Sequence, residues 1–302
     1  MKGTDGMDIL CTQCPRSCGA VRNDYGGAGV CRSGTMPVLA RAAAHNWEEP
    51  CISGKRGSGT VFFSGCALKC VFCQNQKISR EGFGRAVSPA RLREIFLELA
   101  DAGVHNINLV NPTHFSEGIL AALEGGLPVP VVYNTGGYDK VETLQKFSGK
   151  VQIYLPDMKY AHKDIAAKYA AAPDYPQVAR AAILEMFRQV GPYEMGEDGL
   201  LRKGVVIRHL VLPGNLDNTR RVIDWVAETF SPGEVLFSLM SQYTPCGDLE
   251  RFPELRGRLT SEEYDAVLDY MGSAGIEDGF YQELSSAKEE YIPPFDLTGV
   301  EK

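Results

Sequence analysis

The stretch GCALKCVFCQN, residues 65–75, decides how the rest of the chain is interpreted. It places Cys66, Cys70 and Cys73 close together, directly after the apolar run 61–63. A closed structural metal site usually takes four protein ligands. Three neighbouring cysteines therefore indicate a metal site that keeps one position open for another ligand.

The composition limits the kind of protein that carries this stretch. Its 302 residues suffice for one large α/β barrel-type domain or two ordinary domains, and 44% hydrophobic residues allow a sizeable core. A net charge of -7 argues against non-specific nucleic-acid binding, which needs a basic face. No apolar run reaches the roughly 18 residues of a membrane span, and the first residues lack the apolar core of a signal peptide. We therefore expect a cytoplasmic protein that binds neither nucleic acid nor a membrane.

The cysteines form two groups. Nine of them are many for a cytoplasmic chain, and their odd number and clustered spacing favour metal or cluster ligation over disulfides. The second group lies in a Gly-rich segment with little periodicity and consists of Cys11, Cys14, Cys18 and Cys31. It fits either zinc in a closed four-cysteine site or a second iron–sulfur cluster, and the spacing does not decide between them. Cys51 and Cys246 have no assigned role.

From residue 60 onward, apolar runs alternate with helical patterns. After the run 61–63, the expected strands are 106–110, 129–133, 151–155, 205–211 and 234–240. The expected helices start at Ser88-Pro89 and then cover about 116–124, 140–147, 177–190, 218–230 and 261–273, the last with a capping box from Thr260 to Glu263. Six β-α units predict an α/β fold with a parallel sheet, either a partial (β/α)6 TIM-type barrel or an open wound sheet.

Polar, Gly-rich or Pro-rich segments follow each expected strand. In parallel α/β folds, the site lies at the carboxyl ends of the strands. Besides the cysteine loop, these ends are NPTHF (111–115), NTGGY (134–138), PDMKY (156–160), RHLVLPG (208–214) and SQYTPCG (241–247). We expect them to form the rim of an active site. The domain organisation that follows is a small Cys-rich extension (1–50), a barrel core (51–276) and a C-terminal tail that packs on the core (277–302).

The CxxxCxxC spacing after a first strand, with Phe72 before the last cysteine, resembles the radical S-adenosylmethionine (radical SAM) superfamily. Segments along nearly the whole chain, among them HNWEEPCISGKRGSGTVFFSGC (45–66) and IYLPDMKY (153–160), are similar to its pyruvate formate-lyase activating enzyme-like branch. The resemblance implies that Cys66, Cys70 and Cys73 hold a [4Fe–4S] cluster whose free iron is chelated by the methionine part of SAM. One-electron reduction then splits SAM into methionine and a 5′-deoxyadenosyl radical, which abstracts a hydrogen atom.

The resemblance also implies roles for residues at the rim. Phe72 is expected to pack on the adenine or the cluster. Asn111 stands where the superfamily has a GGE-type segment for the SAM amino group, and it could present its amide oxygen there. Asn134 lies in the segment that matches the Asp-Thr-Asn-Gly of true activases. Asp157 matches the acceptor for a ribose hydroxyl or a cation, and Lys159 could face the SAM carboxylate.

Further residues at the rim are expected to bind SAM or the substrate, or to be structural. Arg208 lies inside an apolar strand, where an arginine is costly unless it is paired. Its partner is either the SAM carboxylate or a structural acid. His114 is a candidate on the substrate side, whereas His209 alternates to the other strand face and fits a hydrogen-bonded core histidine better. Gln242, with Tyr243, ends the sixth strand and is expected to line the pocket.

The sequence is compatible with three functions. The first is hydrogen abstraction from the glycine backbone of a partner glycyl radical enzyme, and the second is radical chemistry on a small molecule or another peptide. The third is a non-catalytic iron–sulfur or zinc redox sensor. Both enzymatic functions imply SAM as a partner and a reductant such as flavodoxin or ferredoxin.

Overall fold

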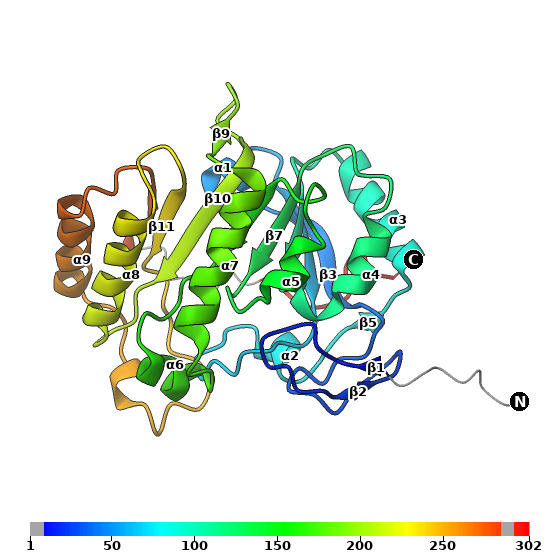
Figure 1. Cartoon of the computed structure of the whole chain (residues 1–302), viewed down its shortest axis with the longest axis horizontal. Coiled ribbons are helices and arrows are strands. Elements are labelled where there is room, and N and C mark those ends of the chain that lie inside the picture. Colours follow the sequence, from blue (N-terminus) through cyan, green and yellow to red (C-terminus); the bar gives the residue numbers. More distant parts are fainter. Residues whose placement is uncertain (1–8, 285–292, 302) are drawn as a thin grey trace, which may run out of the picture.

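The structure, a computed structural model, describes residues 9–284 and 293–301 (Figure 1). One large sheet has the strand order β12-β11-β10-β8-β7-β6-β4-β3-β5. Its strands are β3 (Val38–His45), β4 (Ser58–Phe63), β5 (Arg85–Ala86), β6 (Ile107–Val110), β7 (Val131–Thr135), β8 (Ile153–Pro156), β10 (Leu201–Leu210), β11 (Leu236–Met240) and β12 (Gly279–Tyr281), and β9 (Glu194–Met195) pairs with β10. From β4 to β12, neighbouring strands run parallel.

The strand order distinguishes the two predicted architectures. From β4 to β12 it follows the chain order, apart from the short β9. A doubly wound sheet reverses its strand order at a switch point, and this sheet does not. The predicted α/β class and the partial TIM-type barrel are therefore confirmed.

Helices follow most of the parallel strands and cover one face of the sheet (Figure 1). They are α3 (Pro89–Asp101), α4 (Ser116–Ala122), α5 (Val141–Gln145), α6 (Lys163–Ala170), α7 (Tyr175–Val190), α8 (Leu216–Thr229) and α9 (Ser261–Ser273), with the short α1 (Pro50–Ser53) and α2 (Gln76–Ser79). The central strands β7 and β8 are buried along their whole length.

Local sequence signals set the helix starts as predicted. The Ser88 hydroxyl accepts a hydrogen bond from the Arg91 backbone N–H at 3.1 Å, and Pro89 occupies the first turn of α3. At α9, the capping box between Thr260 and Glu263 is formed in both directions. These caps satisfy backbone N–H groups that the helix itself leaves without partners.

The sheet extends into both terminal parts of the chain. Residues 38–45, within the segment predicted to be the extension, form β3 and pair antiparallel with β4. At the other end, β12 pairs with β11, and the Leu297 N–H donates to the Ala40 carbonyl at 3.0 Å. Part of the tail therefore packs on the core, and residues 285–292 and 302 lie outside the described residues.

The Cys-rich extension lies against the cysteine loop. Its hairpin pairs β1 (Ile9–Leu10) with β2 (Val21–Arg22). The Arg16 guanidinium donates to the Ala67 carbonyl at 2.9 Å and to the Ala170 carbonyl at 3.2 Å, and so joins the extension to the loop. Figure 1 shows the extension in blue beside the cyan segment of α2, at the carboxyl ends of the parallel strands.

None of the helices in residues 9–284 and 293–301 combines the length and apolar character that crossing a membrane requires.

Candidate active site

The carboxyl ends of the parallel strands surround a cavity of about 270 Å³, which we call the cysteine cavity. Cys66, Cys70 and Cys73 all line it. So do all seven residues that the sequence assigned to cofactor binding: Phe72, Asn111, Asn134, Asp157, Lys159, Arg208 and Gln242. Residues up to 176 positions apart in the chain thus meet in one place, because parallel strands end at the same edge of the sheet.

The cysteine loop turns sharply as it leaves β4. Gly65 has a φ of 88°, and a side chain there would meet the carbonyl of Cys31 at 3.0 Å. Glycine is therefore required where the extension crosses the loop. The Leu68 N–H donates to the Cys66 sulfur at 3.4 Å, and the Cys73 sulfur lies 3.3 Å from the Ser79 hydroxyl.

The three thiols influence one another. Burial, together with Cys70 and Cys73, raises the pKa of Cys66 to about 12. Burial also raises the pKa of Cys70 to about 11, although Lys159 and the Tyr160 hydroxyl oppose the rise. Such thiols lose their protons when a strong positive charge, such as bound iron, compensates the thiolates.

The donor set fits an iron–sulfur cluster. Thiolates are the usual cluster ligands, and in a [4Fe–4S] cube each of them binds a different iron. The Tyr160 hydroxyl is buried beside Cys70, and its hydrogen bond to that thiol lowers the pKa of Cys70. It therefore favours the thiolate form that a cluster requires. Within the described part of the chain, no three His, Cys, Asp or Glu side chains converge as ligands of one metal ion.

The other cysteine group lies in the extension. Burial, with smaller contributions from Cys31, Cys11 and Cys18, raises the pKa of Cys14 to about 11; the described thiols thus lie near enough to influence one another but do not converge as ligands of one metal ion. Cys246 lies elsewhere, beside the cysteine loop, and its thiol donates to the Phe72 carbonyl at 3.0 Å.

Arg208 joins four strand ends. It donates to Asp157 at 2.9 Å, to Glu48 at 3.2 Å and to the Asn134 side-chain oxygen at 2.7 Å. Lys159 forms a second ion pair with Asp157. The structure therefore shows Arg208 paired with structural acids, which is one of its two predicted roles.

The charges in this network stabilise one another. Burial alone would raise the pKa of Asp157, but Arg208 and Lys159 outweigh it and hold that pKa below the usual value. Burial raises the pKa of Glu48, and Arg208 only partly offsets the rise. Asp157 is therefore the more firmly ionised of the two carboxylates.

Asn111 sits at the end of β6 in a left-handed conformation with a φ of 59°, which asparagine tolerates better than most residues. Its side-chain N–H donates to the Gly65 carbonyl at 2.7 Å. Its amide oxygen faces the Cys66 sulfur at 3.9 Å. The oxygen thus lies beside the thiols of the cysteine loop.

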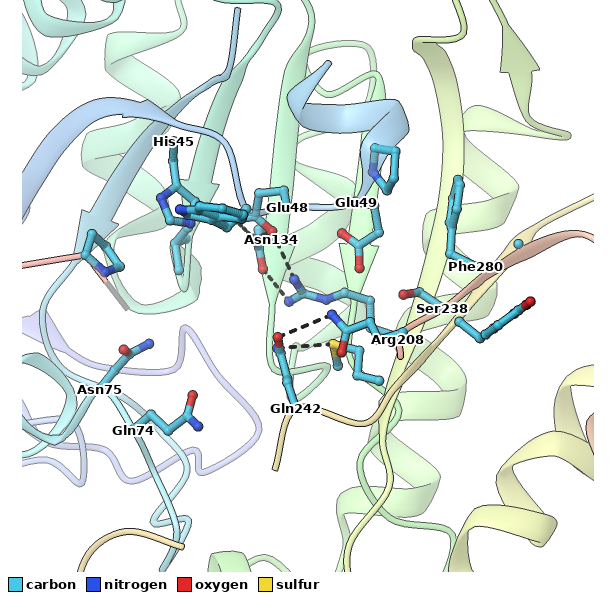
Figure 2. Close-up of a pocket in the computed structure, with 18 of the residues that line it drawn as sticks. His45, Glu48, Glu49, Gln74, Asn75, Asn134, Arg208, Ser238, Gln242 and Phe280 are labelled. Carbon is cyan, nitrogen blue, oxygen red and sulfur yellow. Dashed lines mark hydrogen bonds and ion pairs between the residues drawn. The ribbon is translucent and has the colours of Figure 1, made fainter. Parts of the chain in front are cut away.

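A second cavity of about 560 Å³ adjoins the cysteine cavity (Figure 2). Asn134, Arg208 and Gln242 line both. The second cavity is also lined by Glu48 and Glu49, which the sequence interpretation missed. Their signal was the acidic pair in HNWEEP, but it follows the antiparallel strand β3 and not a parallel one.

Phe72 and Gln242 occupy different positions on the cavity walls. Phe72 is buried and meets the rings of Tyr243 and Tyr169 edge-on, with centroids 5.7 and 6.4 Å apart. Gln242 accepts a hydrogen bond from Gln282 at 3.2 Å, which connects the end of β11 to the segment after β12.

The structure places His114 away from the expected substrate side. It lies in a 3-10 turn, Thr113–Phe115, is 1% exposed and lines neither cavity. Its Nε2 atom lies 2.7 Å from the Ser64 carbonyl. Because a carbonyl only accepts, this nitrogen carries the proton. Burial lowers the pKa of His114 to about 4, so the ring is a neutral interior group.

The core position predicted for His209 is confirmed. Its Nδ1 donates to the Met158 carbonyl at 2.6 Å, and Nε2 accepts from the Thr219 hydroxyl at 3.0 Å. Burial lowers its pKa to about 4 from 6.5.

This histidine should make the protein less stable in acid. Between pH 6.5 and 4 the unfolded chain binds a proton at His209 that the folded chain does not, so the free energy of unfolding falls as pH falls. From pH 8 to 5 the expected loss is about 2 kcal/mol. His209→Gln should remove that part of the pH slope in urea unfolding, and His162→Gln, at a partly exposed histidine, should not. Equal slopes for all three proteins would contradict the assignment.

Comparisons with known proteins agree with this geometry. Residues 53–116 match the family model of a 4Fe-4S single cluster domain. That segment contains the cysteine loop. An uncharacterized protein of Methanocaldococcus jannaschii is 30% identical over 225 residues, which cover 70% of this chain and 61% of that protein.

Solved structures share the fold. SuiB of Streptococcus suis bound to its precursor peptide SuiA has a TM-score of 0.50 and 16% identity, covering 76% of this chain and 49% of SuiB. SuiB bound to S-adenosylmethionine has a TM-score of 0.50 and 15% identity, covering 74% of this chain and 50% of SuiB. The chain thus spans about half of SuiB and has the partial barrel fold of its matching part.

Proposed function

We propose that this protein is a radical SAM enzyme, which binds a [4Fe–4S] cluster through Cys66, Cys70 and Cys73. The proposal is carried by one observation: the three thiols share a cavity with all seven polar or aromatic residues expected to hold SAM. The cluster-domain match and the fold shared with a SAM-binding protein support it. When bound and reduced, the cluster supplies the electron that splits SAM into methionine and a 5′-deoxyadenosyl radical.

The residues of the cysteine cavity position SAM. Asn111 accepts from the SAM amino group, next to the cysteine loop, and Lys159 faces the SAM carboxylate while it remains paired with Asp157. Phe72 packs against the adenine. Arg208 positions Asn134 and Asp157 by hydrogen bonds rather than holding the carboxylate directly.

The second cavity is the place for the substrate. It opens beside Asn134 and Gln242, which also line the cysteine cavity, so a radical formed in one cavity meets a substrate in the other. Its volume of about 560 Å³ suits a small molecule or one side chain of a peptide. The glycine backbone of a glycyl radical enzyme carries no charge, whereas this cavity contains two buried acids. We therefore favour a small molecule or peptide side chain over glycyl radical activation.

The electron donor is external. A small reductant of the flavodoxin or ferredoxin type supplies the electron.

The four cysteines of the extension bind a metal as well. A zinc ion or second cluster at Cys11, Cys14, Cys18 and Cys31 stabilises the extension, which covers the cysteine loop. The influence of Cys11, Cys18 and Cys31 on the pKa of Cys14 supports this proposal.

The test of the function is SAM cleavage. The protein is reconstituted with iron and sulfide without oxygen, reduced with dithionite and given SAM, and 5′-deoxyadenosine is quantified by mass spectrometry. We expect slow cleavage even without substrate. A protein loaded with four irons that forms none would refute the proposal and favour a redox sensor.

A further inference from the structure

We infer that the substrate in the second cavity carries a positively charged nitrogen group and that Glu49 binds it. This inference deepens the proposed function and rests on it, because it names the substrate class of the same site.

The walls of the two cavities contain more acids than bases. Among the described residues that line them, the carboxylates are Glu48, Glu49, Asp157 and Glu283, and the permanent cations are Lys159 and Arg208. Both cations are committed to other acids. Lys159 pairs with Asp157, and Arg208 pairs with Asp157 and Glu48. The two cations nearest to Glu49 therefore already form ion pairs with other carboxylates.

Glu49 is buried and incompletely paired. It is 9% exposed, and its Oε2 atom has no hydrogen-bond partner among the described residues. Figure 2 shows its carboxylate directed into the cavity, above Arg208 and Ser238. Burial raises the pKa of Glu49, and Arg208 opposes the rise without forming a close ion pair. A buried carboxylate oxygen without a donor is costly, and a cationic donor from a ligand removes that cost.

The rest of the wall suits a cation on an apolar stem. Trp47, Phe280 and Tyr281 line the same cavity, and Trp47 and Tyr281 are 56% and 64% exposed. Aromatic faces bind both alkyl chains and the cations at their ends.

The cation that Glu49 binds is not SAM. Glu49 lines the second cavity and not the cysteine cavity, whereas all seven residues assigned to SAM line the cysteine cavity and only Asn134, Arg208 and Gln242 also reach the second. The amino group of SAM has its own proposed acceptor there, the Asn111 side-chain oxygen. The cation at Glu49 therefore belongs to a second molecule.

Binding of model cations tests the inference without turnover. The chain has two tryptophans, so in the reconstituted Trp225→Phe protein Trp47 alone reports on the cavity by fluorescence. The probes are Nα-acetyl-lysine N-methylamide, its neutral norleucine counterpart and pentylamine. We expect the lysine probe to bind at least about tenfold more tightly than the norleucine probe, and Glu49→Gln to remove that preference. Glu185→Gln, at a buried acid of α7 outside both cavities, should retain it.

Comparing the two cationic probes shows whether the natural ligand is a small amine or a peptide. Equal binding of pentylamine and the lysine probe indicates a small amine, and tighter binding of the lysine probe indicates a peptide; both support the inference. It is overturned if Glu49→Gln leaves the preference intact, as expected of a protonated Glu49, or if it weakens SAM binding equally in equilibrium dialysis. Failure of SAM cleavage together with a Glu49-dependent lysine preference would refute the proposed function but not the cation site.

Discussion

Replacing Cys70 by alanine should lower 5′-deoxyadenosine formation by at least about a thousandfold, to the background of the assay. Cys70 lies between the other two thiols of the loop and lines the cysteine cavity with them. With two thiolates left, a [4Fe–4S] cube has no stable attachment to the protein. Iron and sulfide content should therefore fall together with activity, and far-ultraviolet circular dichroism should show that the fold is retained.

Cys246→Ser is the matched control for that loss. Cys246 lies near Cys73, but its thiol donates to the Phe72 carbonyl, and we expect four irons and normal cleavage in the variant. Loss of the cluster in Cys246→Ser as well would mean that four protein thiolates close the site. The open iron position, and with it the proposed chemistry, would then be ruled out.

The sequence predicted those parts of the fold that local signals control. The caps at Ser88 and Thr260 set the starts of α3 and α9, and apolar runs bounded by polar loops marked six of the seven parallel strands, all except β12. The strand rule, by which sites lie at the carboxyl ends of parallel strands, then placed Asp157 and Arg208 at one rim, where they form a hydrogen bond of 2.9 Å. The rule works because all parallel strands end at the same edge of the sheet.

Features that depend on distant partners were not predictable in this way. β3 reads VLARAAAH, with alanines that favour no strand, and it becomes one by pairing with β4. Glu48 follows that antiparallel strand, so the strand rule did not include it. His114 belongs to a rim segment, but a 3-10 turn directs it beneath Ser64. One turn of backbone decides whether such a side chain reaches the cavity or the interior.

Arg208→Met should be the most destabilising single change in the site, with a loss of about 3–5 kcal/mol at neutral pH. The side chain of Arg208 is 14% exposed and its partners Asp157 and Glu48 are 12% and 9% exposed. Without the guanidinium, two buried carboxylates face each other with only Lys159 nearby. Arg91→Met is the control, because Arg91 pairs with two exposed glutamates and its loss should cost less than about 1 kcal/mol.

The pH dependence of the stability lost in Arg208→Met shows whether Arg208 stabilises the fold by its charge or by packing. In the wild type, Arg208 holds the pKa of Asp157 below its usual 3.8, so the stabilisation is present above that value and is lost as pH falls through the folded pKa. In Arg208→Met the carboxylates bind protons more readily, so the deficit measured by urea unfolding should shrink from pH 8 to pH 5. Adding Glu48→Gln should restore part of the stability at pH 8, because Asp157 keeps Lys159 as its partner and Glu48 no longer adds a carboxylate that has lost its cation. A deficit that is the same at both pH values and persists in the double variant would assign the role of Arg208 to packing alone.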